Sequence, residues 1–461
     1  MVCAASIAIL LLMAVAKGQE RQNKDELFQS AVSLYEAGKY AEAVGPLEKL
    51  VKEAPETFEV QELLGLVYAA QAEDAKANKH LAKAVRLEPG SAEARSNLAA
   101  SYARLGKMEL AQEQFLRAAE LDPKNYETNH NLGEIYVRQG MVAKAVPYLE
   151  KAQRIKSSSY DNGYDLALAY MVTGRLTEAR TAAEELLKVK ETAELHNLLA
   201  HIEEKAGNYI AAANEFQAAA RREPTESNLF DWGGELLLHR TLDPAVQVFE
   251  QAVQRYPNSP RLMVGLGMAY YARGNYDDAV KAFLKGADLD PTDARCYKFL
   301  SRAYDSSPSQ ADEVIERFRR YAELQPSNGQ AQYYYAMSLW KGKRAQDTGF
   351  DLKQIEALLA RAIAADPKLA EAHLQMGNVN SDQGRFAEAI PEYRRALELN
   401  RDLADAHYRL GQALARTGQK DKAQDEFAVY QRLREQHLSD LEKQRSEIRQ
   451  FVYNEKGTER P

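Results

Sequence analysis

A small residue recurs along this chain with a period close to 34 residues. Glycine, alanine or serine occupies each of its twelve positions, which are Ala31, Gly65, Ala99, Gly133, Ala167, Ala200, Gly233, Gly267, Ser301, Ala336, Gly377 and Gly411. Self-similarity at a fixed period of this size is typical of one supersecondary element that is repeated and stacked. We therefore expect the whole length to form a solenoid, and we expect its function to lie on a surface.

The residues around this position predict the shape of each repeat. An alanine recurs twelve positions later, as at Ala77 and Ala111, and two small positions per repeat let packed helices approach closely. Between them stands a glycine that can end a helix in the left-handed conformation. It is found at Gly38, Gly106, Gly140, Gly174, Gly207, Gly274, Gly384 and Gly418. A proline such as Pro123 or Pro291 closes most repeats, because proline cannot continue a helix. Each repeat is therefore predicted to be a helix, a turn, a second helix and a stop.

Two repeats show the pattern most fully. One contains Asn97, Leu98, Ala99, Tyr102, Gly106, Ala111, Phe115, Ala118 and Pro123, and the other contains Leu266, Gly267, Tyr270, Gly274, Tyr276, Ala279, Phe283 and Pro291. This pattern resembles the tetratricopeptide repeat. The resemblance implies an all-α fold, a right-handed superhelical solenoid built from antiparallel helix pairs.

The resemblance also divides the chain. Repeats one to nine fill residues 24–328, an irregular repeat ten fills 329–369, and repeats eleven and twelve with a C-terminal capping helix fill 370–452. Residues 453–461 are expected to be a disordered tail. The step from Ala336 to Gly377 is 41 residues, which predicts a loop insertion in repeat ten at 341–350. Such an insertion either carries binding or is a neutral surface loop. The final helix is predicted to hide the last apolar surface, with a partner-binding or coiled-coil extension as the alternative.

The first sixteen residues differ from the rest of the chain. Residues 1–16 carry no charged side chain, and Ala14-Val15-Ala16 offers a small-x-small cleavage site, so we expect a secretory signal peptide and an exported protein, periplasmic or extracellular. The apolar run is shorter than the roughly 20 residues of a membrane-spanning helix. An uncleaved anchor that ties the protein to a membrane is the alternative. Cys296 is then the one cysteine left after cleavage, and we expect it to be buried and inert.

The sequence contains no recognised catalytic constellation. HExxH, CxxC, P-loop and GxSxG patterns are absent. His196 and His201 are five residues apart on one predicted helix, which points their rings to different faces. We expect no catalytic residue, no cofactor and no metal. Pentatricopeptide repeats share the helical hairpin and bind RNA, but a net charge of -7 argues against a phosphate-binding groove. We therefore expect no nucleic acid among the partners.

The resemblance implies that the first helix of each repeat lines a concave groove that binds a protein or an extended peptide. Positions 2, 5, 9 and 12 of the repeat share one helical stripe. In repeats one to six this stripe is mostly acidic or neutral, with acids such as Glu59, Glu93 and Glu134, which suits a basic segment. In repeats eight to ten it becomes basic and aromatic. The predicted partner-binding residues are Arg261, Tyr271, Arg295, Lys298, Arg302, Tyr333, Tyr334 and Trp340.

A second interpretation of these residues is internal. Arginine and lysine can pair with acids of neighbouring repeats, and tyrosine and tryptophan can pack on the adjacent hairpin. The triplet Arg295, Lys298 and Arg302 favours a ligand, because like charges at this spacing repel one another unless an anion answers them. We therefore predict a non-enzymatic protein–protein interaction scaffold or peptide-binding adaptor of the cell envelope. The alternatives are a membrane-tethered assembly factor and a regulatory helical arm of an enzyme complex whose catalytic subunit is a separate chain.

Overall fold

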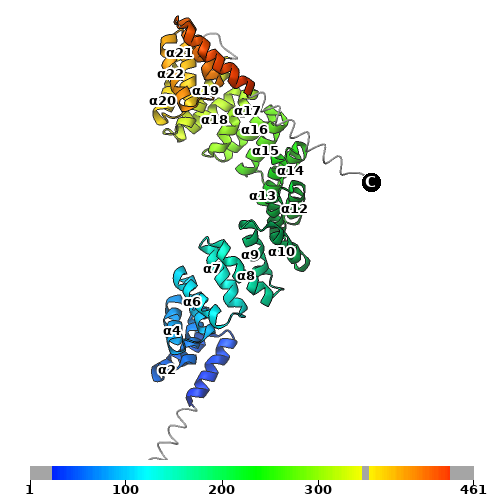
Figure 1. Ribbon diagram of the computed structural model, residues 1–461, viewed down its shortest axis with the longest axis vertical. Helices are drawn as coiled ribbons and strands as arrows, with labels where there is room; N and C mark the ends of the chain where they lie inside the picture. Colours follow the sequence, from blue (N-terminus) through cyan, green and yellow to red (C-terminus); the bar gives the residue numbers. More distant parts are fainter. Residues whose placement is uncertain (1–22, 345–351, 437–461) are drawn as a thin grey trace, which may run out of the picture. The chain divides into compact units, whose positions relative to one another are not determined.

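The computed structural model describes residues 23–344 and 352–436, and all regular secondary structure in these ranges is helical. The predicted all-α helical repeat solenoid is confirmed (Figure 1). In the same ranges no helix is both long enough and apolar enough to cross a membrane. The chain divides into two compact units, an N-terminal unit of Met1–Pro224 and a C-terminal unit of Thr225–Pro461.

The described part of the N-terminal unit is a series of helical hairpins, each made of a first and a second helix. The first helices span 23–36, α3 (Phe58–Ala70), α5 (Ala92–Arg104), α7 (Tyr126–Arg138), α9 (Tyr160–Val172) and α11 (Ala193–Lys205). Their second helices are α2 (Tyr40–Glu53), α4 (Asp74–Leu87), α6 (Met108–Leu121), α8 (Val142–Ile155), α10 (Leu176–Val189) and α12 (Tyr209–Arg222).

The C-terminal unit continues the same alternation. Its first helices are α13 (Glu226–Leu238), α15 (Pro260–Arg273), α17 (Ala294–Ser306), α19 (Gly329–Arg344), α21 (Ala370–Asp382) and α23 (Ala404–Arg416). Its second helices are α14 (Leu242–Arg255), α16 (Tyr276–Leu289), α18 (Ala311–Leu324), α20 (Lys353–Ala365), α22 (Phe386–Leu399) and a helix over 420–436.

The hairpin turns follow the predicted glycines. All eight glycines named for the turns have a positive φ, between 71° at Gly38 and 92° at Gly274. Only glycine adopts this conformation without a steric penalty from Cβ. Three turns without glycine place Ala72, Arg240 and Gln310 in the same region, with φ of 57°, 59° and 55°.

Polar caps start the first helices. In seven of them a Ser, Thr, Asn or Asp side chain accepts a hydrogen bond from a backbone N–H of the first turn, as Ser91 does from Ala94 and Asn125 does from Thr128. These bonds satisfy N–H groups that the helix itself leaves unpaired. The second helices have no side-chain cap in the described residues, whether they follow a tight turn or, as α20 does, the insertion of repeat ten.

Where the small residue of a first helix is glycine, it faces a large side chain on the second helix. A Cβ added to Gly65 would lie 2.6 Å from Cγ of Leu81, and one added to Gly267 would lie 2.5 Å from Cε1 of Phe283. Both distances are far below van der Waals contact. The large partner comes sixteen residues after the glycine, whereas the sequence predicted an alanine twelve residues later as the partner. Those alanines are buried as well, for example Ala77.

Repeats nine and ten depart from the pattern. In repeat nine the turn before the second helix contains no glycine, and that helix begins at Ala311. Helix α19 continues through Arg344, so the insertion begins later than Lys341. The rest of the insertion, the predicted leader 1–16, the capping helix beyond 436 and the tail 453–461 lie outside the described residues.

Candidate binding surface

The first helices form the inner layer of each unit. Successive first helices touch one another along α3, α5, α7, α9 and α11, and again along α13, α15, α17 and α19. Among the described second helices, only α16 and α18 approach each other as closely. In a curved stack, the layer whose helices lie closer together is on the inner side. Side chains exposed on the first helices therefore face the concave surface of their unit, where an extended segment can contact several repeats.

Lys298 and Arg302 are two exposed cations of this surface in the C-terminal unit. They stand one helical turn apart on α17, and neither has an ion-pair partner within 23–344 and 352–436. Burial raises the pKa of the Tyr334 hydroxyl on the next first helix, and the positive charge of Arg302 opposes that rise. Helices α17 and α19 are in contact, so the two cations and this tyrosine belong to one surface.

Aromatic rings extend this surface. The ring centroids of Tyr333 and Tyr334 are 5.9 Å apart, and those of Tyr334 and Phe318 are 5.7 Å apart. Both tyrosines are half-buried, and burial raises the pKa of the Tyr333 hydroxyl. Rings that are fixed by packing and still partly exposed provide contact area for a ligand at little cost in side-chain entropy.

The other predicted contact residues have partners inside the protein. Arg295 donates to both carboxylate oxygens of Asp293, at 3.0 and 2.8 Å. Arg261 pairs with Asp231 at 3.3 Å and lies 3.8 Å from the ring centroid of Phe230, both on α13. For these two arginines the second interpretation holds, in which the charge is paired with an acid inside the protein.

Tyr271 and Trp340 also contact their own repeats. The Tyr271 ring packs on Tyr276 of the same hairpin, with centroids 5.3 Å apart. Trp340 is only 6% exposed and belongs to the core with Leu339 and Ile355. The placement of Trp340 on the partner surface is therefore wrong, because its side chain packs among the buried residues that α19 shares with α20.

The inner surface of the N-terminal unit is acidic. The first turns of α3, α5, α7, α9 and α11 each expose a carboxylate at the same repeat position, at Glu59, Glu93, Glu127, Asp161 and Glu194. Deeper on the same face, burial raises the pKa of Glu62, and the charges of Glu93, Glu88 and Glu59 raise it further, against a hydrogen bond from Asn97. This bond, from Nδ2 to Oε1, is 3.2 Å long and joins two successive repeats.

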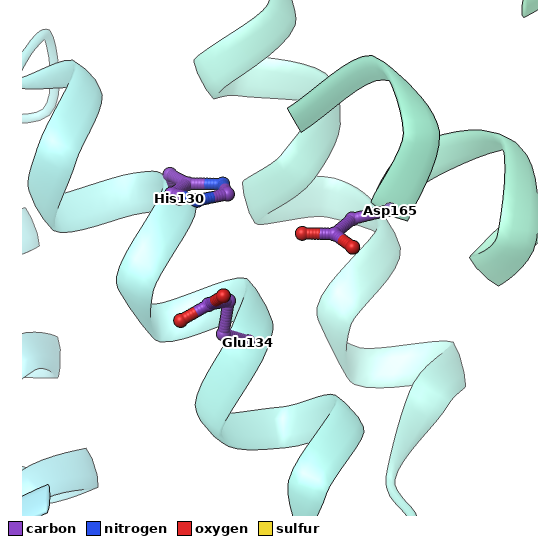
Figure 2. A group of neighbouring side chains, drawn as sticks. All are labelled: His130, Glu134 and Asp165. Atoms are coloured by element: carbon purple, nitrogen blue, oxygen red, sulfur yellow. The ribbon is translucent and has the colours of Figure 1, made fainter. Parts of the chain in front are cut away.

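His130, Glu134 and Asp165 meet on this surface between α7 and α9 (Figure 2). One nitrogen of His130 and one carboxylate oxygen from each acid all lie within 4.8 Å of one another. Burial raises the pKa of Asp165; the charge of His130 opposes this rise, and Glu134 adds to it. The sequence alone does not reveal this group. His130 and Glu134 have the i, i+4 spacing of one helix face, but Asp165 joins them only through the stacking of the next repeat.

The remaining histidines and the cysteine have structural contacts. His196 hydrogen-bonds Glu215 and Glu191, at 2.6 and 3.1 Å, while the His201 ring packs edge-on against Phe216. The prediction that the two rings do not share a site is confirmed. Cys296 is fully buried, its Sγ lies 3.0 Å from the Phe283 carbonyl oxygen, and burial raises the pKa of its thiol. This confirms the expected inert thiol.

Comparisons with known proteins identify the repeat. Models described as tetratricopeptide repeats match residues 28–92, 90–158, 136–202, 236–303 and 405–437, and a TPR repeat model matches 381–418. Together these segments cover more than half of the chain.

Individual relatives are distant. The chain is 22% identical over 198 residues to the human mitochondrial import receptor subunit TOM70, covering 41% of this chain and 31% of that protein. It is 26% identical over 218 residues to lipopolysaccharide assembly protein B of Escherichia coli K12, covering 46% of this chain and 53% of that protein. The chain thus spans about half or less of these relatives. The solved C-terminal part of a TPR repeat-containing protein from Cytophaga hutchinsonii is 18% identical, with a TM-score of 0.43 over 53% of this chain and 97% of that chain.

Proposed function

Because the chain belongs to the tetratricopeptide repeat family, we propose that it is a non-enzymatic scaffold that holds an extended segment of a partner protein against the inner face of its first helices. Names of relatives support a role in reception or assembly, since one is a mitochondrial import receptor subunit and another a lipopolysaccharide assembly protein. In this proposal the protein supplies no chemistry of its own. Its repeats supply a long surface whose charge varies along the chain.

The observation that carries the proposal is the pair Lys298 and Arg302 beside Tyr334. Like charges one helical turn apart destabilise a helix by roughly 0.2–0.5 kcal/mol, so an anionic ligand relieves a repulsion that the folded chain leaves in place. The half-buried tyrosines beside them offer apolar contact to the same ligand. We therefore propose that the C-terminal unit recognises an acidic segment that also carries an aromatic or aliphatic side chain.

Charge reversal tests this proposal with a matched control. The double variant Lys298→Glu, Arg302→Glu changes the inner surface, while Lys285→Glu, Arg394→Glu makes the same change in net charge at exposed positions of the second helices α16 and α22. The probe is a fluorescent glutamate-rich peptide containing tyrosine, and the readout is its anisotropy with the full chain. We expect the inner variant to bind at least tenfold more weakly, and the outer variant to bind like the wild type.

Two further readouts accompany the affinity. The wild-type affinity is expected to fall as salt rises, because exposed charges are screened. A lysine-rich peptide of the same length is expected to bind the inner surface of the C-terminal unit less well than the acidic one. Equal affinity of the inner variant and the wild type, or equal weakening in the outer variant, contradicts the proposed surface.

We further propose that the protein is exported to the cell envelope. The uncharged leader at residues 1–16 supports this location, as does the name of the lipopolysaccharide assembly relative. Mass spectrometry of the N-terminus after cell fractionation tests it. A soluble exported product that begins near Lys17 is the expected result, and an intact Met1 in the membrane fraction favours the tethered assembly factor. An intact Met1 in the cytosol contradicts export and favours the regulatory arm of an enzyme complex.

A further inference from the structure

We propose that His130, Glu134 and Asp165 bind a divalent transition-metal ion of the zinc class, which links the fourth and fifth repeats on the inner face of the N-terminal unit. Two ligands come from α7 and the third from α9, and their donor atoms all lie within 4.8 Å of one another. No other set of three His, Cys, Asp or Glu side chains approaches this closely within residues 23–344 and 352–436. The proposal does not depend on the identity of a protein partner.

The donor set suits this class of ion. One imidazole nitrogen and two carboxylate oxygens are ordinary zinc ligands, at bond lengths of roughly 2.0–2.2 Å. Tetrahedral angles with such bonds place neighbouring donor atoms roughly 3.4 Å apart. The donor atoms therefore have to close by at most about 1.4 Å, which rotations of half-buried carboxylates can supply. A hard ion such as Mg²⁺ prefers six oxygen ligands and has little use for the imidazole.

Buried neighbours orient His130 as neighbours orient a metal-bound histidine. Its Nδ1 is 3.2 Å from Oδ1 of Asn162, whose side chain is fully buried. The amide of Asn162 donates to the Leu149 carbonyl oxygen at 3.0 Å and to Oε1 of Gln153 at 2.7 Å, which fixes which end of the amide faces the histidine.

The fixed amide also fixes the tautomer of His130. Because Oδ1 of Asn162 can only accept, the proton of a neutral His130 sits on Nδ1, and Nε2 keeps its lone pair. An outer hydrogen bond from one ring nitrogen that leaves the other free is the usual arrangement around a bound metal. The Tyr126 ring stacks on His130, with centroids 5.6 Å apart and planes 8° apart, so the imidazole is held on its face as well.

The carboxylates are available for an ion. Arg138 approaches Glu134 only at 3.7 Å, from the adjacent turn of the same helix. Asp165 has no ion-pair or hydrogen-bond partner in the described residues. Two carboxylates that face each other repel, Arg138 offsets this repulsion only from the side of Glu134, and a divalent ion between the carboxylates removes it. Glu134 and Asp165 also line a surface pocket of about 180 Å³ with Val137 and Leu168. Three protein ligands leave one coordination position for water or for a ligand in this pocket.

Metal titration of the full-length, untagged chain tests the proposal. After removal of metal with a chelator, Co²⁺ is added as a spectroscopic probe and its visible d–d absorption is followed, and Zn²⁺ is then used to displace it. We expect one ion per chain, tetrahedral-type absorption, and a rise in thermal stability with Zn²⁺ but not with Mg²⁺. Metals that bind only the folded state stabilise it by mass action.

Ligand variants and a matched pair of controls locate the ion. His130→Ala and the nearly isosteric Asp165→Asn are expected to weaken Co²⁺ and Zn²⁺ binding at least tenfold. His201→Ala and Glu204→Gln change another histidine–carboxylate pair on a first helix, 3.3 Å apart, and are expected to bind like the wild type. Far-UV circular dichroism of each variant checks that it folds. If His130→Ala does not fold, Asp165→Asn still decides between the outcomes.

Several outcomes overturn the proposal. One is wild-type affinity for Zn²⁺ in Asp165→Asn, and another is equal weakening in the control variants. Thiolate charge-transfer absorption would place the ion on a cysteine instead. Absence of binding at Zn²⁺ concentrations up to 1 mM would refute a metal site. The carboxylates would then be available to pair with a basic side chain of a partner.

Discussion

Phe249 lies between two glycines of successive repeats, and it shows how single residues set the helix spacing. A Cβ added to Gly233 would lie 2.9 Å from Cε2 of its ring, and a Cβ added to Gly265 would meet the opposite edge of the ring. The ring therefore has no free side to move toward. These first-helix positions require a small residue because a large side chain of the second helix fills the space where a larger residue would place its side chain.

Two adjacent glycines of α13 provide a prediction for this packing. Gly233→Ala is expected to destabilise the protein by about 1–3 kcal/mol, the usual cost of overpacking a filled core. Gly234 has open space around its added Cβ, so Gly234→Ala is expected to stabilise by up to about 1 kcal/mol through helix propensity. Thermal or urea unfolding checks both, and a loss of stability in Gly234→Ala would contradict the packing described for α13.

The turns give a second prediction at this scale. Ala72 has a φ of 57° in a turn where other repeats use glycine, and a left-handed L-residue costs about 1–2 kcal/mol. Ala72→Gly is expected to raise stability by about 1 kcal/mol. The reverse change Gly106→Ala, at a φ of 71° with open space around the added Cβ, is expected to lower it by a similar amount. Unfolding curves compared with wild type check the signs, which must be opposite.

At the scale of elements, tyrosines join neighbouring repeats. Tyr68 of α3 donates to Glu48 of α2 at 2.6 Å, and Tyr270 of α15 donates to Glu250 of α14 at 2.6 Å. Tyr170 of α9 makes the same bond to Glu150 of α8, at 2.8 Å. Each bond runs from a first helix to the second helix of the preceding repeat. Burial, followed by the hydrogen bond to the carboxylate, raises the pKa of each of the three tyrosines to about 12.

These three bonds predict an alkaline loss of stability. A tyrosine of the unfolded chain titrates near 10 and the folded one near 12, so the folded state holds the phenol proton more tightly. The contribution is complete below pH 10 and is lost as pH rises through 12. We expect the triple variant Tyr68→Phe, Tyr170→Phe, Tyr270→Phe to be less stable at pH 8 and to lose part of the fall in melting temperature between pH 9.5 and 11.5. A fall identical to that of the wild type would contradict the role of these bonds.

At the scale of the whole molecule, the two compact units have separate cores. Clusters around Leu64 and Leu149 belong to the N-terminal unit, and clusters around Phe283 and Leu359 belong to the C-terminal unit. Stability in repeat proteins is approximately a sum of repeat and nearest-neighbour terms. We therefore expect residues 23–224 and 225–461, expressed separately, each to be helical by circular dichroism and to unfold cooperatively. A fragment without helical structure would contradict this division.

The sequence predicts the fold far better than the site. The eight turn glycines and the buried small residues of the first helices can be predicted locally, because a positive φ or a close helix contact restricts the residue type at a single position. Trp340 was misplaced because its repeat position does not show that this large ring packs into the core with Ile355 of α20. The group of His130, Glu134 and Asp165 was missed because it forms only when one repeat stacks on the next. Arg295 was placed on the partner surface, but its charge is paired with Asp293, the residue that caps its own helix.

Partners are proposed to bind along the inner layer of first helices. Site-specific photo-crosslinking in the cells that make this protein tests it most directly, with the photoreactive residue placed at Lys298 on α17 or, as the control, at Lys285 on the outer helix α16. We expect a discrete crosslinked protein from position 298 and none from position 285. The same adducts from both positions, or an adduct from position 285 alone, would contradict it.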